Sequence, residues 1–161
     1  MPPLQGLRVV QSKIHGYGGV ATRTFKAGEI VVHGDGVLYA QTDDFDDTYA
    51  LIMDGKGGET VLFDLADQTR WFNHACDPNT EVCSAWDRET DTMRAWWLAL
   101  RDIAVGEEIT YDYGFAAEVA EPCYCGSAHC RGVIVDEDPA VQAELAPHLR
   151  SLLRTPARAA S

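Results

Sequence analysis

The sequence has little positive charge: 13 Lys and Arg residues stand against 25 Asp and Glu, for a formal net charge of −12 at pH 7. Because contact with nucleic-acid phosphates requires a basic surface, this balance argues against a direct nucleic-acid partner. An acidic surface favours basic partners, including lysine-rich peptides, although it also simply keeps a protein in solution. Charge therefore excludes one class of partner without selecting another.

The sequence also lacks long hydrophobic runs. A stretch such as "AWWLAL", residues 95–100, is far shorter than the roughly 20 residues that span a bilayer. The start, "MPPLQGLRVVQSKIHG", has no apolar segment behind a basic one, so we expect no signal peptide. These absences predict no membrane partner and an intracellular location, cytoplasmic first, with a nuclear or nucleoid-associated one as the alternative.

Short β-branched runs separated by turn residues dominate the first two thirds of the chain. They predict strands over 7–12, 29–34 and 34–41, another strand from 60, and a hairpin that turns at "DRETD", 87–91. The acidic, Gly-rich stretch 42–60 is expected to be a variable loop around "YALIM". The pattern favours a mainly β domain, and 161 residues suit one domain with a small appendage.

The C-terminal stretch "DPAVQAELAPHLRSLLR" has a helical pattern. Asp138 is the predicted N-cap, and Pro139 would occupy the first helical position. Pro147 is expected to break or kink the helix, and "TPARAAS", 155–161, to be a fraying tail.

The cysteines are unevenly distributed: none precedes Cys76, and three lie within "CYCGSAHC", 123–130. In an intracellular chain such crowding favours a metal site over disulfides, and three close thiolates can hold one side of a tetrahedral zinc ion. Cys76, Cys83 and His129 are candidates for the fourth ligand. Because Cys83 falls in a predicted strand and His129 directly adjoins Cys130, Cys76 at the edge of a turn is favoured.

Four motifs, which follow one another along the chain in the family's order, resemble those of SET-domain lysine methyltransferases. "RWFNHACDPN" looks like the family's R-F-x-N-H-S-C-x-P-N, and "GEEITYDYGF" is similar to its G-E-E-L-T-[YF]-D-Y-G. "HGYGGVAT" resembles the N-terminal G-x-G segment, and "CYCGSAHCRG" the post-SET zinc motif. The motifs span 15–132, and the Asn-His and Tyr-Asp-Tyr motifs together with the cysteines are highly specific.

The resemblance implies a SET-domain, β-clip-like fold of several short curved sheets with a pseudoknot, followed by the C-terminal helical segment. We expect a SET catalytic core at 5–115, a post-SET zinc-binding segment at 116–135 and a helical tail at 136–161. The implied activity is methylation of lysine in a protein substrate, histone-like, ribosomal or otherwise basic, with S-adenosylmethionine as donor. The implied zinc is structural.

The family's site residues can be carried over only where the motifs match. Asn73 would meet the amino end of the cofactor, and the backbone at His74 the adenine. Tyr113 matches the catalytic tyrosine, and Tyr111 the position that sets the number of methyl groups; being Tyr, it implies mainly monomethylation. The implied cofactor-binding residues are Gly16, Tyr17, Gly18, Arg70, Asn73 and His74. The implied zinc ligands are Cys76, Cys123, Cys125 and Cys130.

The chain also departs from the family pattern. Ala75 replaces the usual Ser, and Gly19, which we expect to add flexibility, replaces an apolar residue. Gly34 stands where the family often has an aromatic near the lysine channel, and "RGVIV" after Cys130 lacks the aromatic that often closes over the cofactor. Gly34 and the missing aromatic after Cys130 favour the alternative of a non-catalytic SET-fold module that binds a peptide or protein. The Asn-His pair and Tyr113 favour the enzyme.

Overall fold

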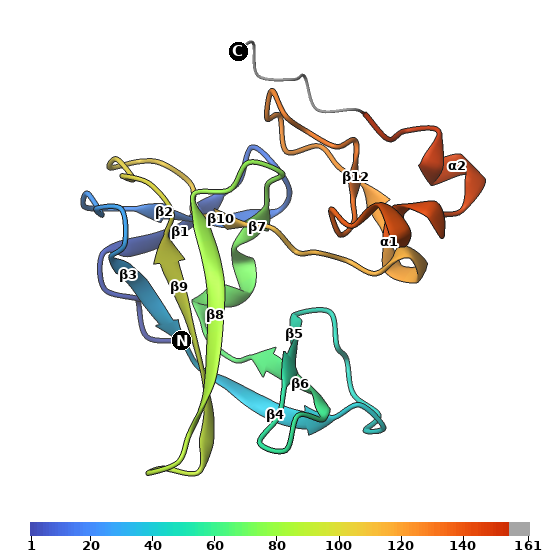
Figure 1. Ribbon diagram of the computed structural model, residues 1–161. Helices are drawn as coiled ribbons and strands as arrows, with labels where there is room; N and C mark the ends of the chain where they lie inside the picture. Colours follow the sequence, from blue (N-terminus) through green and yellow to red (C-terminus); the bar gives the residue numbers. More distant parts are fainter. Residues whose placement is uncertain (155–161) are drawn as a thin grey trace.

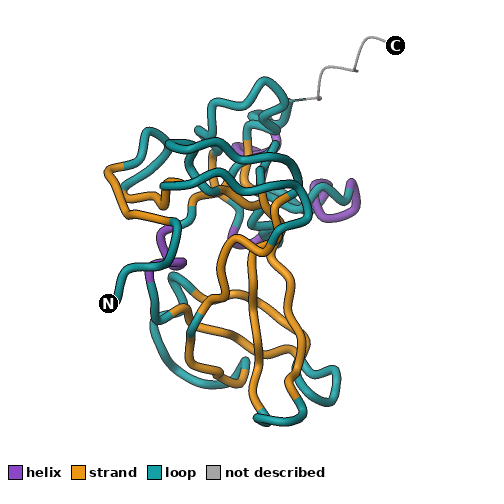
Figure 2. Tube along the Cα trace, turned by 90° about the vertical axis from the view of Figure 1, so that its left-hand side faces the viewer, coloured by secondary structure: helices purple, strands orange, loops and turns teal. Residues whose placement is uncertain are grey.

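The computed structural model describes residues 1–154, so the predicted tail at 155–161 lies outside the described residues. Strands and loops make up most of the chain, and the helices are short (Figure 1). Figure 2, turned by 90°, shows the same predominance of strand and loop. The expectation of a mainly β protein of several small sheets is confirmed.

Within residues 1–154 the strands form five small sheets, in the orders β1-β2, β3-β9-β8, β4-β6-β5, β10-β7 and β11-β12. The strands are β1 (Leu7–Gln11), β2 (Tyr17–Ala21), β3 (Ile30–Gly34), β4 (Gly36–Ala40), β5 (Ala50–Asp54), β6 (Thr60–Leu65), β7 (Asn73–His74), β8 (Thr80–Asp87), β9 (Thr92–Ala99), β10 (Thr110–Tyr111), β11 (Glu121–Pro122) and β12 (Val133–Ile134). The helices are η1 (Gln68–Trp71), η2 (Ala117–Val119), α1 (Pro139–Ala143) and α2 (Pro147–Arg150).

The predicted hairpin is the β8–β9 pair, which is antiparallel from Thr80↔Ala99 to Asp87↔Thr92. Alternate residues of β9 face the core, as the two-residue period of a strand requires, and Trp97 is wholly buried among them. Phe72 is equally buried. The expectation that the large aromatics form the core holds for these two, whereas Trp71 and Trp96 are only partly buried.

The segment 42–60 is more regular than the expected loop. β5 lies within it and pairs with β6 from Ala50↔Asp64 to Asp54↔Thr60. Only Met53 of this strand is buried, at 7% exposure, while Ile52 is 72% exposed. The loop prediction failed because a strand with two inward side chains, the partly buried Leu51 and the buried Met53, has too short an alternating pattern to be recognised.

The parallel pair β7–β10 joins segments that are far apart in the sequence. Asn73 pairs with Thr110, and His74 with Tyr111. The Asn79 side chain strengthens the junction, because its Oδ1 accepts a hydrogen bond from the Thr110 N–H at 2.9 Å. The two motif segments are thus threaded together, as the expected pseudoknot requires.

The C-terminal part forms a second, smaller apolar cluster. Asp138 caps α1 by accepting a hydrogen bond from the Ala140 N–H at 2.8 Å, Pro139 opens the helix and α2 begins at Pro147, as predicted. No helix within 1–154 has the length and apolar character to cross a membrane. The buried members of this cluster are Ala117, Val133, Val135, Leu145 and Leu149.

Candidate functional site

Three hydrogen-bond acceptors lie around the side-chain amide of Asn73, at the start of β7. Its Nδ2 lies 3.1 Å from the His15 carbonyl, 2.9 Å from the Tyr17 carbonyl and 2.8 Å from Glu108 Oε1. The residue is 8% exposed. Asn73 therefore fixes the glycine-containing segment 15–18 against the knot.

The glycines of this segment meet different constraints. Gly16 has φ +49°, and nothing lies within 4 Å of the place a Cβ would take, so its backbone is open to a ligand. A Cβ on Gly18 would collide with the Glu108 carboxylate, and one on Gly19 with the Phe72 ring. Gly19 is buried, so its small size serves packing rather than the expected flexibility.

Glu108 was not recognised from the sequence as a site residue. The Ser12 hydroxyl lies 2.8 and 2.9 Å from its two carboxylate oxygens, and the Asn73 amide donates to one of them. It thereby places a negative charge beside the carbonyls at 15 and 17. The sequence did offer a signal, because Glu108 belongs to the Glu pair of the motif "GEEITYDYGF" and lies two residues before Thr110 of β10.

His74 connects the knot to the cysteines. Its Nδ1 accepts a hydrogen bond from the Tyr113 N–H at 3.1 Å, and its Nε2 lies 3.2 Å from Cys76 Sγ. Burial lowers the pKa of His74 to about 4, so the ring is neutral near pH 7. The Nδ1 atom, already an acceptor, forms no ion pair with Asp112 at 3.5 Å, and the Nε2–H is left to donate to the sulfur.

Tyr113 and Tyr111 lie side by side, with ring centroids 4.9 Å apart. The Tyr113 hydroxyl donates to the Phe72 carbonyl at 2.8 Å, and its ring lies 5.3 Å from that of Phe115. Burial raises the pKa of both tyrosines above its usual value. Both hydroxyls are therefore neutral at ordinary pH, in an aromatic surrounding.

Arg70 lies in the last turn of η1, with its guanidinium group 4.2 Å from the centroid of the Tyr49 ring. Its Nε is buried without a hydrogen-bond partner among the described residues. The structure thus gives Arg70 a cation–π contact with the segment before β5. Its implied contact with a cofactor remains a prediction.

The structure brings together the four cysteines that the sequence singled out, Cys76, Cys123, Cys125 and Cys130. Their sulfur atoms all lie within 4.8 Å of one another, and those of Cys76 and Cys123 are 3.7 Å apart. With Zn–S bonds of about 2.3 Å, the sulfurs of a tetrahedral site are separated by about 3.8 Å. The cluster therefore has the dimensions and the donor atoms that fit zinc.

Backbone N–H groups donate hydrogen bonds to two sulfur atoms of the cluster. Cys76 Sγ accepts from the Arg131 N–H at 3.3 Å, and Cys130 Sγ from the Gly132 N–H at 3.3 Å. Burial raises the pKa of Cys76 to about 11, so without a cation this thiol keeps its proton near pH 7. Cys83 lies in β8, outside this group, as expected for a strand residue.

A second link between the C-terminal part and the knot was not predicted. The Arg131 guanidinium donates to Asp112 Oδ1 at 2.8 Å, with 10% of the Arg131 side chain and 32% of the Asp112 side chain exposed. Asp112 lies between the two tyrosines, and Arg131 directly follows the last cysteine. The pair could not be found from sequence because neither residue has a local pattern that indicates its partner.

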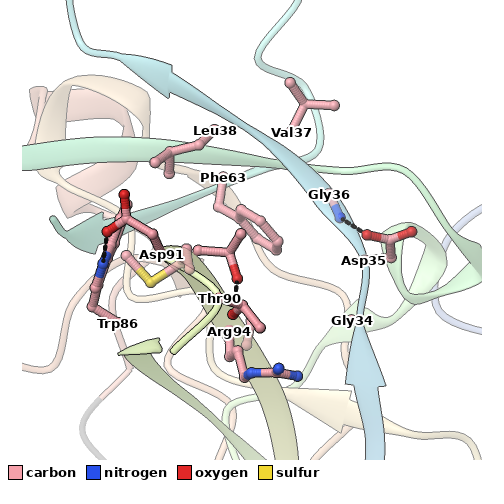
Figure 3. A pocket seen from close by; sticks show the side chains of 13 residues that line it. Gly34, Asp35, Gly36, Val37, Leu38, Phe63, Trp86, Thr90, Asp91 and Arg94 are labelled. Atoms are coloured by element: carbon pink, nitrogen blue, oxygen red, sulfur yellow. Dashed lines mark hydrogen bonds between the residues drawn. The ribbon is translucent and has the colours of Figure 1, made fainter. Parts of the chain in front are cut away.

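A separate hollow of about 510 Å³ lies between β4 and the β8–β9 hairpin (Figure 3). Figure 3 shows Leu38, Phe63, Trp86 and Asp91 on one side of the view and Gly34, the last residue of β3, on the other. Of the residues singled out from the sequence, Gly34 lines it, whereas none of the expected catalytic, cofactor-binding or zinc-binding residues does. The hollow is therefore distinct from the knot and the cysteines.

The fold and this site define a class: a small β protein whose Asn-His and Tyr-Asp-Tyr segments are knotted together beside a thiol cluster. The SET domain family model matches residues 16–114, more than half of the chain. The protein belongs to the SET domain family.

Relatives and solved structures agree with this assignment. The chain is 35% identical over 143 residues to human histone-lysine N-methyltransferase 2B, covering 79% of this chain and 5% of the relative. It is 34% identical over 142 residues to histone-lysine N-methyltransferase set1 of Dictyostelium discoideum, covering 78% and 9%. The chain thus spans a small fraction of the length of these relatives.

Among solved structures, the chain resembles KRYPTONITE in complex with mCHH DNA, an H3(1-15) peptide and SAH. The TM-score is 0.65 at 25% identity, covering 80% of this chain and 29% of that one. A second KRYPTONITE complex, with mCHG DNA and SAH, gives a TM-score of 0.69 at 26% identity, covering 83% and 30%.

Proposed function

We propose that the protein methylates lysine side chains of a protein substrate, with S-adenosylmethionine as the methyl donor. The observation that carries the proposal is the parallel pairing of β7 with β10, which holds Asn73 and Tyr113 in one knot. The histone-lysine methyltransferase names of the relatives and the SAH in the KRYPTONITE complexes support it.

The glycine-containing segment and Asn73 fit the donor's amino-acid end. The carbonyls of His15 and Tyr17 converge on the Asn73 amide, and the Glu108 carboxylate adds a negative charge suited to a cationic amino group. The open backbone at Gly16 allows close approach. When bound, S-adenosylmethionine supplies an electrophilic methyl group.

The tyrosines fit the acceptor side of the reaction. A lysine amine titrates near 10.4 and must be neutral to attack, and an aromatic surrounding disfavours its charged form. A shift of about three units would cost roughly 4 kcal/mol of binding energy. Tyr113 orients the reacting groups and is not the base, because burial raises its pKa and its hydroxyl proton is engaged with the Phe72 carbonyl.

We propose that the main product is monomethyl-lysine, because the Tyr111 hydroxyl occupies space that Phe would leave free. The change Tyr111→Phe should shift the product toward di- and trimethyl-lysine in mass spectra of the modified peptide. An unchanged product distribution would refute this role of Tyr111.

The substrate is proposed to be a histone-like or other basic protein. The formal charge of −12 favours a basic peptide and disfavours direct contact with nucleic acid. The names of the relatives and the H3 peptide in one KRYPTONITE complex favour histone tails, and hence action at chromatin over the cytoplasmic location expected first.

We further propose that Cys76, Cys123, Cys125 and Cys130 hold one structural zinc ion. Four thiolates complete a tetrahedral coordination and leave no position for a reactive water. The Cys76 ligand is then tied through His74 to the Tyr113 backbone. Zinc would therefore stabilise the side of the site that contains Tyr113.

Calorimetry with S-adenosylmethionine and transfer of a labelled methyl group to mixed histones and a peptide array test this function. We expect Asn73→Ala to weaken donor binding. Tyr113→Phe should keep the affinity for the donor and lower kcat by roughly 10²- to 10³-fold, the usual loss when one positioned donor is removed. Tyr124→Phe, at a site 78% exposed, is the matched control.

Two results would contradict the proposal: no donor binding by the wild type, or full activity of Tyr113→Phe. The alternative, a non-catalytic module that binds a peptide or protein, predicts peptide binding without donor binding. The same calorimetry therefore separates the two functions.

A further inference from the structure

The buried indole of Trp97 fills the space in front of Gly34. A Cβ built on Gly34 would lie 2.7 Å from Trp97 Cζ3 and 3.2 Å from Cη2. Trp97 is wholly buried, and Gly34 pairs with Ala95 across the β3–β9 ladder. A side chain at position 34 and this indole therefore exclude one another.

The same indole packs against the residues of the proposed reaction site. Its ring meets Tyr111 edge to face, with centroids 5.7 Å apart, and Phe72 edge to face at 5.4 Å. Tyr111 in turn contacts Tyr113, whose hydroxyl is bonded to the Phe72 carbonyl. Trp97 thus contacts both the space in front of Gly34 and the Tyr111 ring, and forms part of the support of the tyrosine pair.

Trp97 Nε1 is buried without a hydrogen-bond partner among residues 1–154. Buried polar groups are almost always paired, so an N–H left without an acceptor marks a place where a lone pair from outside the chain is expected. An ordered water would satisfy it. The N–H is a donor only, and cannot accept a proton as a hydroxyl could.

We infer that Trp97 is a positioning residue that sets the number of methyl groups the enzyme adds, because it supplies from β9 the aromatic wall that Gly34 leaves absent from β3. It acts through Tyr111, which its ring holds in place. The inference rests on the proposed lysine methylation. It also explains why Gly34 does not leave the wall open, the feature that had favoured a non-catalytic module.

The main test is Trp97→Phe, which keeps an aromatic ring while reducing its size and removing the N–H. With more room beside Tyr111, the ratio of di- and trimethyl to monomethyl product in mass spectra should rise about tenfold, the scale on which a pocket discriminates one carbon group. Donor affinity by calorimetry should be unchanged. Trp96→Phe is the matched control, since its partly buried ring contacts His33 instead.

An exchange of side chains provides a second, independent test. Gly34→Ala forces a Cβ against the indole and should lower kcat while leaving KM for the donor unchanged. Adding Gly34→Tyr to Trp97→Ala moves the aromatic from β9 to β3, and should restore monomethyl selectivity relative to Trp97→Ala alone. The product ratio, unlike kcat, does not depend on the fraction of protein that is folded, so its rescue separates a role in selectivity from a contribution to stability.

The outcomes distinguish this inference from the function on which it rests. If the wild type transfers no methyl group, both are wrong. If the wild type is active but Trp97→Phe gives the same product ratio as Trp96→Phe, only the role of Trp97 is wrong. Failure of the Gly34→Tyr/Trp97→Ala exchange to improve on Trp97→Ala would likewise overturn the proposed wall.

Discussion

The SET core and the C-terminal segment after residue 116 are held together in different ways. The core cluster contains sixteen buried apolar or aromatic side chains, including Phe25, Leu65 and Trp97, whereas the C-terminal cluster contains five. A cluster of five small or aliphatic side chains buries too little surface to order such a segment alone. The segment therefore depends on the thiol cluster and on its contacts with the knot.

Both of these contacts end at the Tyr-Asp-Tyr segment, 111–113, where β10 ends. Cys76 and His74 connect the cysteines to the Tyr113 backbone, and Arg131 pairs with Asp112. Loss of the C-terminal segment should therefore affect the proposed reaction site even though the core remains folded. The core and the C-terminal segment, which have different sources of stability, therefore meet at residues 111–113.

Removal of zinc should have the largest effect and should separate the two regions. Structural zinc contributes roughly 10–16 kcal/mol of apparent binding free energy, far more than five apolar side chains can replace. We expect Cys123→Ser, or chelation, to make residues 116–154 sensitive to protease and to weaken donor binding, while the core keeps its near-UV circular dichroism. Cys83→Ser is the control, and elemental analysis gives the zinc content.

If chelation left both donor affinity and protease resistance unchanged, the cysteines would not be a structural metal site. The same comparison would then require another source of order for the C-terminal segment.

A cavity in the core should have the next largest effect, and the resulting loss of structure should extend from the core to the C-terminal segment. Phe25 is wholly buried beside Ile103, and Phe→Ala in a core costs about 3–5 kcal/mol. Urea unfolding of Phe25→Ala should show both regions losing structure together. Leu149→Ala, in the smaller cluster, should instead loosen only the C-terminal segment, and equal losses from both variants would show that the chain is one cooperative unit.

Local structure could be predicted from the sequence where one short motif determines it. The β8–β9 hairpin, the Asp138 cap and the break at Pro147 follow from turn and cap chemistry. β5 was missed because only Leu51 and Met53 face the core, so its alternation is too short to distinguish it from a loop.

Pairings between distant segments could not be derived from the residues alone. The partners of Glu108 and Arg131 lie 35 and 19 residues away, and no local pattern identifies them. The grouping of Cys76 with the later cysteines was favoured by its turn position, but its distance from them depended on the fold. Likewise, Gly34 suggested only a missing side chain, and the tertiary structure shows Trp97 in that space.

The pH dependence of kcat/KM should show whether Tyr113 titrates during the reaction. Below its pKa near 10.4, a lysine substrate gains neutral amine about tenfold per pH unit, so kcat/KM should rise with a slope near one from about pH 6 to 9. Burial raises the pKa of Tyr113, so its hydroxyl stays neutral over this range and adds no second slope. Tyr113→Phe should lower the whole profile without moving it, whereas a shifted profile would make Tyr113 a titrating base.

Breaking the ion pair between the regions should have a smaller effect. Arg131→Met keeps most of the side-chain volume. It also leaves intact the hydrogen bond that the backbone N–H of residue 131 donates to Cys76 Sγ. We expect a loss of about 1–2 kcal/mol in stability of the C-terminal segment, since Asp112 remains partly solvated. In a double-mutant cycle with Asp112→Asn, most of this loss should appear as coupling energy between the two residues. Additive losses would mean that the ion pair does not stabilise the C-terminal segment.

The smallest effect should come from the cap of α1, where the C-terminal segment relies on local chemistry alone. Asp138→Ala removes the hydrogen bond to the Ala140 N–H and should cost about 1 kcal/mol. Hydrogen exchange should become faster in α1 and α2 but remain unchanged in β7 and β10, because α1 has no wholly buried residue through which the loss could reach the knot. Glu137→Ala, one residue earlier and also exposed, is the control. If protection of Asn73 or Tyr111 fell as well, the two regions would be coupled through the helices, and not only at the Tyr-Asp-Tyr segment.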